Sequence, residues 1–317
     1  MRKLLSRTAL AIAATGMLGL ASVPAQAEDI VFMTGPAGGS WYPLGGAIKN
    51  ILEEEVSGLS VTIRPGAGLI NLKGVSGGKA HMGWSLVMSA VDGIAGNEPF
   101  EAPLKDICNL GSFYDNTMQI TSTDQAVNSA ADLKGKALVT LPRGNTTELG
   151  ARAVLKSAGL TYDDMSKVNF ASISDGVNMM KDGQVDAMMT ITSVPNGSLL
   201  DLTNSRTVKF VPITDEQFAS MKKQNAGWQR LTIKANSYPG QEQDVLVAGF
   251  PAHLILNCSS VSEETAYNIT KALIKRGSGL STIVKSLATL DAKKMAVDIG
   301  VPFHPGSIKA YKEAGAM

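Results

Sequence analysis

The sequence contains few of the residues that build metal and redox sites: two cysteines and three histidines among 317 residues. None of them has the short spacing of zinc ligands, so we expect neither a metal nor a cofactor. Aromatic residues make up only 5% of the chain. Lysine and arginine (29) nearly balance aspartate and glutamate (28), and neither sign forms a block. Broad electrostatic capture of nucleic acid is therefore not expected.

The composition that remains is typical of a packed globular protein. Hydrophobic residues account for 44% and charged residues for 18%, which is too apolar for a disordered chain. A chain of this length has room for about two domains of ~150 residues each.

Residues 1–27 have the pattern of a secretory signal peptide. Arg2, Lys3 and Arg7 precede a short apolar stretch, and Ala25-Gln26-Ala27 is a small-x-small cleavage site. The alternative, a membrane anchor, is disfavoured because the stretch is short for a span of ~20 residues. No later stretch reaches the ~18 uninterrupted apolar residues of a membrane helix. We expect cleavage after Ala27 and export to a bacterial periplasm.

Cys108 and Cys258 would meet oxidising conditions in that compartment, where disulfides form. The sequence does not give the distance between them, and a bond requires a close Cα approach. One disulfide and two separate buried thiols both stay open.

Two segments of the chain share one pattern at an offset of 105 residues. In the first, the apolar run Ile30–Met33 precedes a glycine-rich turn, and Ser40 stands as the N-cap of an amphipathic helix that closes at Gly58. In the second, the strand Ala137–Val139 precedes a turn, and Asn145 caps a helix with Glu148 in capping-box position. This offset favours duplicated architecture.

Each copy alternates strands and helices, which predicts an α/β fold of two lobes with mainly parallel sheets. We expect residues 28–118 and 250–317 to form lobe 1, and residues 119–249 to form lobe 2. The hinge should lie near Thr117–Thr121 and Val247–Ala252, with a ligand cleft between the lobes.

The two turns are the strongest candidates for a binding site. Glycine lets the backbone approach a ligand, and the amides at a helix start attract anions. In the two-lobed arrangement, the turns Gly38–Tyr42 and Arg143–Thr147 would face each other. Arg143 could pair with a carboxylate or stay solvated, and Trp84 could line the pocket or pack in the core.

Other motifs in the sequence lack the context that their chemistry needs. Gly35–Gly39 does not have the G-x-G-x-x-G spacing of a dinucleotide fingerprint. Gly74–Gly78 fits the G-x-S-x-G elbow of hydrolases, but Ser76 would follow a helix and precede a strand, the reverse of that elbow. His81, His253 and His304 are far apart in sequence. We therefore expect no enzymatic activity, with an exported serine hydrolase as the alternative.

Several motifs resemble those of one family. Gly38 to Gly46 reads G-G-S-W-Y-P-L-G-G and is similar to the G-G-T-Y-Y-P-x-G-G signature of the TAXI family, the solute-binding components of TRAP transporters. Further matches run along the chain: Asp132–Lys136, Gly159–Asp164, Asp182–Ala187, Tyr238–Gln241 and His304–Gly306.

The resemblance implies a type II periplasmic-binding-protein fold that closes on a small organic acid or amino acid. It further implies delivery of the ligand to a TRAP-type membrane permease driven by an ion gradient; a membrane sensor is the alternative partner. We expect the receptor to be a monomer. The ligand-binding residues expected from the turns and the resemblance are Gly39, Ser40, Trp41, Tyr42, Asn71, Trp84, Ser85, Met88, Arg143, Gly144, Asn145, Thr146, Thr147, Thr192 and Ser193.

The chain departs from the family pattern on both sides of the expected cleft. Leu86-Val87-Met88 replaces a polar run, and Gly68 stands where serine is common. The second turn, residues 142–148, is one residue longer than usual and carries the added cation Arg143. These departures point to an acid with a less polar tail than glutamate.

Overall fold

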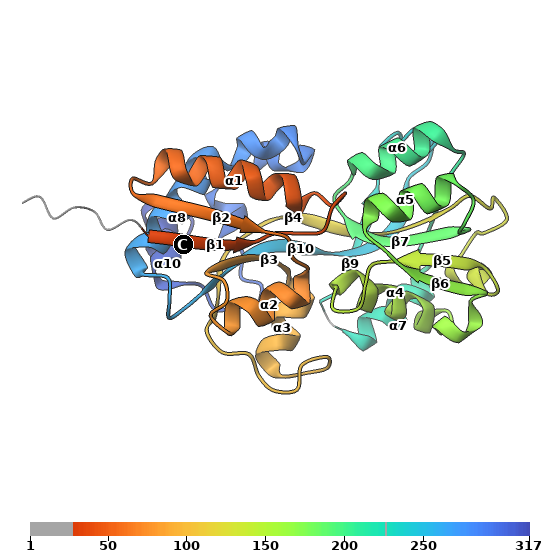
Figure 1. Ribbon diagram of the computed structural model, residues 1–317, viewed down its shortest axis with the longest axis horizontal. Helices are drawn as coiled ribbons and strands as arrows, with labels where there is room; N and C mark the ends of the chain where they lie inside the picture. Colours follow the sequence, from red (N-terminus) through yellow and green to blue (C-terminus); the bar gives the residue numbers. More distant parts are fainter. Residues whose placement is uncertain (1–27, 226) are drawn as a thin grey trace, which may run out of the picture.

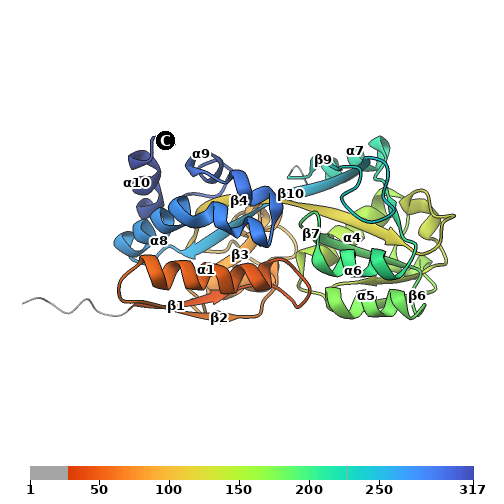
Figure 2. The same ribbon diagram turned by 90° about the horizontal axis from the view of Figure 1, so that it is seen from above.

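The computed structural model describes residues 28–225 and 227–317. The expected signal peptide, residues 1–27, lies outside the described residues. Two α/β halves lie side by side and are joined by long strands (Figures 1 and 2). No helix in the described part of the chain is long and apolar enough to cross a membrane.

The first half begins with two βα units and a third strand and helix. Its elements are, in chain order, β1 (Glu28–Met33), α1 (Trp41–Glu55), β2 (Leu59–Arg64), α2 (Gly68–Ser76), β3 (Met82–Leu86) and α3 (Val87–Ala95). The apolar face expected for α1 is buried at Leu44, Ile48 and Leu52. The helix ends at Glu55, before the glycine that was expected to close it.

The long strand β4 (Ile107–Ser122) leads into the second half. Its elements are β5 (Ala137–Thr140), α4 (Thr146–Ser157), β6 (Lys167–Phe170), α5 (Ile173–Lys181), β7 (Ala187–Thr192), α6 (Gly197–Ser205), β8 (Lys209–Val211), α7 (Asp215–Gln224) and β9 (Gln229–Ile233).

A second long strand, β10 (Val245–Asn257), returns the chain to the first half. There α8 (Glu263–Arg276), α9 (Ala292–Met295) and α10 (Pro305–Glu313) follow. Ser262 caps α8, because its hydroxyl accepts from the Thr265 amide. The helix α8 is tied to α1 by Glu55, which pairs with Lys275 at 2.6 Å and Arg276 at 2.8 Å.

The sheet order is β2-β1-β3-β10-β4-β7-β5-β6, so the two halves mirror each other about the β10–β4 pair. Within each half, the central strand pairs in parallel with both of its neighbours. The predicted duplication also holds in the element starts. Helices α1 and α4 begin at Trp41 and Thr146, and α2 and α5 begin at Gly68 and Ile173, both 105 residues apart.

The strands β4 and β10 cross between the halves where Thr117 lies opposite Gly249. A Cβ atom at Gly249 would lie 2.1 Å from the Asn116 carbonyl oxygen, so a glycine is needed for this close approach. Both crossing residues lie within the two expected hinge segments. The lobe boundaries at 118/119 and 249/250 stay a prediction.

Cys108 and Cys258 form a disulfide, which decides the alternative that the sequence left open. Their Cα atoms are 5.4 Å apart although 150 residues separate them in the chain. The pair lies where β4 begins and β10 ends, at the far side of the first half from the crossing. In the chain-entropy model, a loop of this length contributes on the order of 5 kcal/mol to stability.

Candidate ligand-binding site

A cavity of about 30 Å³ lies between the two halves. The first half contributes Pro36, Gly39, Ser40, Trp41, Gly68 and Leu86; β4 contributes Asn116; the second half contributes Leu141, Asn145, Thr146, Thr147, Ile173, Ile191 and Thr192. The two predicted turns therefore meet at one cavity.

Most of the lining follows the internal repeat. Five pairs of lining residues stand 105 positions apart in the sequence: Pro36 and Leu141, Ser40 and Asn145, Trp41 and Thr146, Gly68 and Ile173, Leu86 and Ile191. The cavity therefore lies on the pseudo-symmetry axis, and each half presents equivalent positions with different side chains.

Four helices point their N-terminal ends at the cavity. The first residues of α1, α2, α4 and α5 (Trp41, Gly68, Thr146 and Ile173) all line it. The first amides of a helix have no intrahelical partner and carry partial positive charge. None of the described lining residues is charged. The site therefore favours an anion through backbone amides and neutral side chains.

The two halves differ in whether a side chain caps the N-terminus of each helix at the cavity. In the second half, the Asn145 side chain accepts from the Thr147 amide at 2.9 Å, and the Ser172 hydroxyl accepts from the Asp175 amide at 3.2 Å. In the first half, neither Ser40 nor Ala67 caps its helix through a side chain. Ser40 has the expected N-cap position without the expected capping bond.

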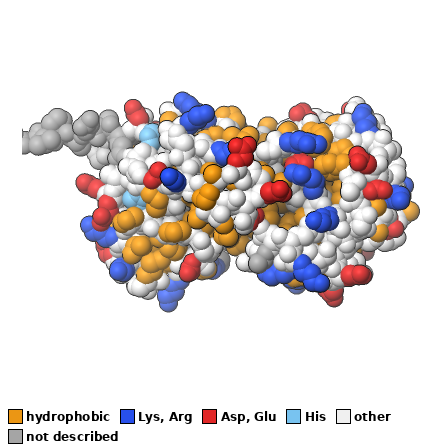
Figure 3. All heavy atoms as spheres, turned by 90° about the horizontal axis from the view of Figure 1, so that it is seen from below, with side chains coloured by type: hydrophobic (Ala, Val, Ile, Leu, Met, Phe, Trp, Pro, Cys, Tyr) orange, Lys and Arg blue, Asp and Glu red, His pale blue; other side chains and the backbone are white. Residues whose placement is uncertain are grey.

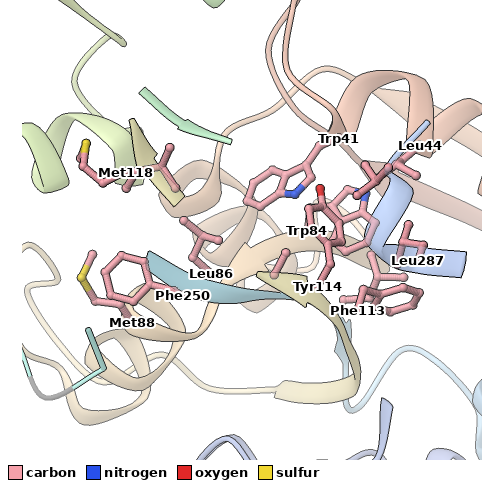
Figure 4. Packing of buried hydrophobic residues seen from close by; sticks show 14 of the residues in the cluster. Trp41, Leu44, Trp84, Leu86, Met88, Phe113, Tyr114, Met118, Phe250 and Leu287 are labelled. Atoms are coloured by element: carbon pink, nitrogen blue, oxygen red, sulfur yellow. The ribbon is translucent and has the colours of Figure 1, made fainter. Parts of the chain in front are cut away.

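Ser40 is engaged instead by a residue far away in the chain. Its hydroxyl lies 2.9 Å from the Tyr114 hydroxyl on β4. Burial raises the pKa of Tyr114, so its hydroxyl stays protonated. Trp41 is stacked on Trp84, with ring centroids 5.9 Å apart, and Leu86 lines the cavity beside it (Figure 4). The turn Gly38–Tyr42 thus packs against a cluster of aromatic side chains.

Seven of the fifteen predicted ligand-binding residues line the cavity: Gly39, Ser40, Trp41, Asn145, Thr146, Thr147 and Thr192. The eight others lie elsewhere: Tyr42, Asn71, Trp84, Ser85, Met88, Arg143, Gly144 and Ser193. Whether any of the fifteen contacts a ligand stays a prediction.

Asn71 supports the cavity from behind. It is fully buried, and its Oδ1 accepts from the Ala67 amide at 3.1 Å. Its Nδ2 donates to the carbonyl oxygens of Thr34 and Trp84, both at 2.8 Å. These bonds fix the start of α2 against β1 and β3.

Trp84, Ser85 and Met88 are buried in the first half, whereas Tyr42 is 46% exposed on α1. Ser193 lines a neighbouring hollow between the halves, beside Asn196 and Ser198.

Arg143 is exposed, and its guanidinium carbon lies 5.9 Å from the centroid of the Phe170 ring. Gly144, which follows it, has a φ of +88°, a left-handed conformation that turns the chain into α4. Lysine and arginine side chains of the second half gather beside the junction of the halves, with acidic side chains among them (Figure 3).

The predicted binding residues omit seven lining residues, although the family pattern had placed Gly68 and Leu86 at the expected cleft: Pro36, Gly68, Leu86, Asn116, Leu141, Ile173 and Ile191. The repeat contained a signal for six of them, because they form three pairs at the offset of 105 residues. Asn116 lies on β4, outside the repeat, and had no such signal.

The side chains considered for catalysis are buried or hydrogen-bonded in ways that stabilise the fold. Ser76 is the last residue of α2, and its hydroxyl accepts from the Lys105 amide at 3.2 Å. His304 caps α10 by accepting from the Gly306 amide at 3.2 Å. His253 is fully buried with its Nδ1 3.1 Å from Asn109 Oδ1, and burial lowers its pKa to about 3. Within residues 28–225 and 227–317, no group of three His, Cys, Asp or Glu side chains could hold a metal ion.

Comparison with solved structures finds a similar fold in two proteins with TM-scores of 0.51. A structure described as a putative L-cystine ABC transporter from Listeria monocytogenes is 15% identical, with 83% of this chain and 97% of that chain covered and a TM-score of 0.51. A protein of Bordetella bronchiseptica RB50 is 18% identical, with coverages of 90% and 82% and a TM-score of 0.51. The periplasmic aliphatic sulphonate binding protein SsuA from Escherichia coli also matches, at 14% identity, coverages of 90% and 83%, and a TM-score of 0.47.

A model of the NMT1-like family matches residues 32–315, which is nearly the whole described chain. With this match and the mirrored sheet order, the chain belongs to the NMT1-like family and has the two-lobed α/β fold of periplasmic binding proteins.

Proposed function

We infer that this protein is an exported solute-binding receptor that closes its two halves around a small organic anion. The observation that carries this proposal is the convergence of four helix N-termini on one cavity between the halves. A receptor needs no reacting group, and the cavity offers amides, hydroxyls and apolar side chains.

Contacts between the halves support a closing mechanism. The hydroxyls of Ser89 and Thr146 lie 3.0 Å apart across the junction. On one side the Asn196 side chain donates to the Gly38 carbonyl at 3.1 Å, and on another the Asn225 side chain donates to Asp92 at 2.7 Å. A ligand that touches both halves adds to these contacts and shifts the population toward the closed form.

The experiment combines calorimetry with solution X-ray scattering on the purified protein, using a panel of small carboxylates, sulfonates and amino acids. A binding compound should reduce the radius of gyration as the halves close. Mass spectrometry of molecules that co-purify with the protein widens the search. A protein that binds none of them and keeps its dimensions would contradict the receptor function.

We propose a TRAP-type permease as the membrane partner, on the strength of the TAXI-like motif at Gly38–Gly46. The proposal predicts that uptake into membrane vesicles with this protein stops when the ion gradient is collapsed. Uptake that instead follows ATP would indicate an ABC-type partner, and ligand-dependent signalling without uptake would indicate a sensor. Export with cleavage after Ala27 predicts a mature N-terminus at Glu28, which N-terminal sequencing of the periplasmic fraction checks.

A further inference from the structure

The partial charges around the cavity favour a negatively charged ligand and offer no partner to a positively charged one. The positive ends of α1, α2, α4 and α5 meet there, and no described lining residue is an aspartate or glutamate. A carboxylate is favoured by this arrangement. The ammonium group of an amino acid would enter the same cavity without an opposite charge to pair with it.

The acidic residues nearest in sequence to the lining are used elsewhere. Glu148, next to Thr147, is buried, but its carboxylate accepts from Arg152 at 3.1 Å and from the Tyr162 hydroxyl at 3.2 Å. Asp175, in the first turn of α5, accepts from the Ser172 hydroxyl at 2.7 Å.

A third acid, Asp115, directly precedes the lining residue Asn116 on β4. Successive side chains on a strand point to opposite faces, and Asp115 is exposed whereas Asn116 is 2% exposed. None of the three acids can therefore serve as the counter-ion of an ammonium group without leaving its present position.

Neutral groups complete the lining. Leu86, Leu141 and Ile191 offer an apolar wall. Asn116 Oδ1 has no hydrogen-bond partner among the described residues, although it is buried at the cavity. An uncharged donor such as a ligand hydroxyl would satisfy this oxygen, because an amide oxygen accepts hydrogen bonds without needing a cation.

We propose that the cavity selects small organic acids that carry one negative charge, a short apolar chain and no ammonium group, and that it rejects the corresponding amino acids. This inference rests on the proposed receptor function and narrows its ligand class.

Matched compounds test the proposal on the purified full-length mature protein. 3-Methylbutanoate and valine have the same carbon skeleton and differ by the amino group, while 2-hydroxy-3-methylbutanoate carries a neutral donor in its place. 3-Methylbutanamide removes the negative charge. The same set is made for unbranched acids of two to six carbons, and calorimetry measures each dissociation constant.

We expect the tightest acid to bind at least 100-fold more tightly than its 2-amino counterpart and its amide. The 2-hydroxy acid should stay within about tenfold of the parent acid, which separates the effect of charge from that of bulk. An amino acid that binds as tightly as its parent acid would overturn the proposal.

A variant provides the missing counter-ion. Asn116→Asp places a carboxylate at the cavity and should move the preference between acid and amino acid at least tenfold toward the amino acid. Asp115→Asn, on the opposite face of the strand, is the matched control and should leave the preference unchanged. An unchanged preference in Asn116→Asp would count against the proposal.

The ligand class and the receptor function fail in different ways. If amino acids bind and cause compaction while the parent acids do not, the ligand class is wrong and the receptor function stands. If no compound of the panel and no co-purified molecule binds, both are wrong.

Discussion

The two halves of the molecule share one plan and differ in the chemistry that they bring to the cavity. Each contributes two helix starts at equivalent positions, and the sheet order is mirrored. In the first half the starts of α1 and α2 have no side-chain cap. In the second half Asn145 and Ser172 cap α4 and α5.

This difference indicates a division of labour. Where no side chain takes the first amides, they remain open to a ligand, so the first half should hold the anion. Where Asn145 already takes one amide, the second half contributes mainly side chains, Thr146 and Ile173 among them. A duplicated fold can thus keep its geometry while one copy binds the anion through backbone amides and the other covers the ligand with side chains.

The largest expected effect comes from making the halves alike at Gly68, whose counterpart is Ile173. A Cβ atom at Gly68 would lie 2.3 Å from Thr146 Oγ1, so Gly68→Ile should push the second half away. We expect affinity for the ligand to fall more than 100-fold, which is about 3 kcal/mol. Calorimetry and solution scattering measure the loss of binding and of compaction.

The matched control is Gly46→Ile on α1, because a Cβ atom there meets nothing within 4 Å. Binding by this variant should stay within about threefold of wild type. If Gly68→Ile still binds and closes, the close contact between Gly68 and Thr146 does not control closure.

Acid should destabilise the first half more than the second, because His253 and His304, whose pKa values are lowered by burial, both lie outside residues 119–249. Burial lowers the pKa of His253 to about 3, below its usual value of 6.5, and burial also lowers the pKa of His304. The unfolded chain therefore binds protons first as the pH falls below 6.5, and stability falls between pH 6.5 and 3 while staying unaffected above pH 7.

Urea unfolding at pH 7 and pH 5 measures this loss, for which His253 alone accounts for about 2 kcal/mol. His253→Gln should lose less stability between the two pH values than wild type does. At pH 5, the protection of backbone amides from hydrogen exchange, measured against the intrinsic exchange rate at that pH, should fall in the first half before the second. An equal loss of protection in both halves would argue against His253 as the cause.

The two N-cap positions should respond to mutation by different mechanisms. Asn145→Ala removes a cap and should cost about 1 kcal/mol of unfolding free energy, and Asn145→Ser should restore it. Ser40→Ala leaves the Tyr114 hydroxyl without this partner and should also cost about 1 kcal/mol. Adding Tyr114→Phe should recover most of that loss.

Thermal and urea denaturation of Asn145→Ala, Asn145→Ser, Ser40→Ala and the double variant Ser40→Ala with Tyr114→Phe measure these differences. If Tyr114→Phe recovers the stability lost in Ser40→Ala, then Ser40 stabilises the protein through its hydrogen bond to Tyr114 and not as a helix cap. Failure to recover would mean that Ser40 acts on the helix itself.

The smallest effect is expected at Arg143, the cation that only the second turn carries. Because its side chain is exposed and packs near Phe170, it can attract an anion only at long range. Arg143→Gln should weaken binding less than threefold at low salt and not at all at 0.5 M salt. A tenfold loss that persists in salt would show direct contact with the ligand.

The sequence predicts those features that depend on local chemistry. The strands, the turns and most helix starts follow from apolar periodicity, glycine and capping residues within a few positions. The repeat predicts the mirrored halves. Features that depend on distant parts of the chain were out of reach: Ser40 bonds to Tyr114, 74 residues away, and Asn116 reaches the cavity from a strand outside the repeat.

The orientation of side chains was equally hard to predict. A turn motif does not tell whether Arg143 lies along the surface or enters the cavity, since both place the same backbone in the same turn. Asn71 fits a binding motif, yet all its described bonds go to the backbone of the first half.

The Cys108–Cys258 bond gives the chain a closed covalent circuit that contains the whole second half and both crossing strands. A protease that cuts one peptide bond within that circuit would open it without releasing a fragment. The covalent link joins the two strands at one end only, and antiparallel pairing continues from there to Thr117 and Gly249. In the proposed receptor, opening would therefore bend the two strands beyond their paired segment, which ends at Thr117 and Gly249.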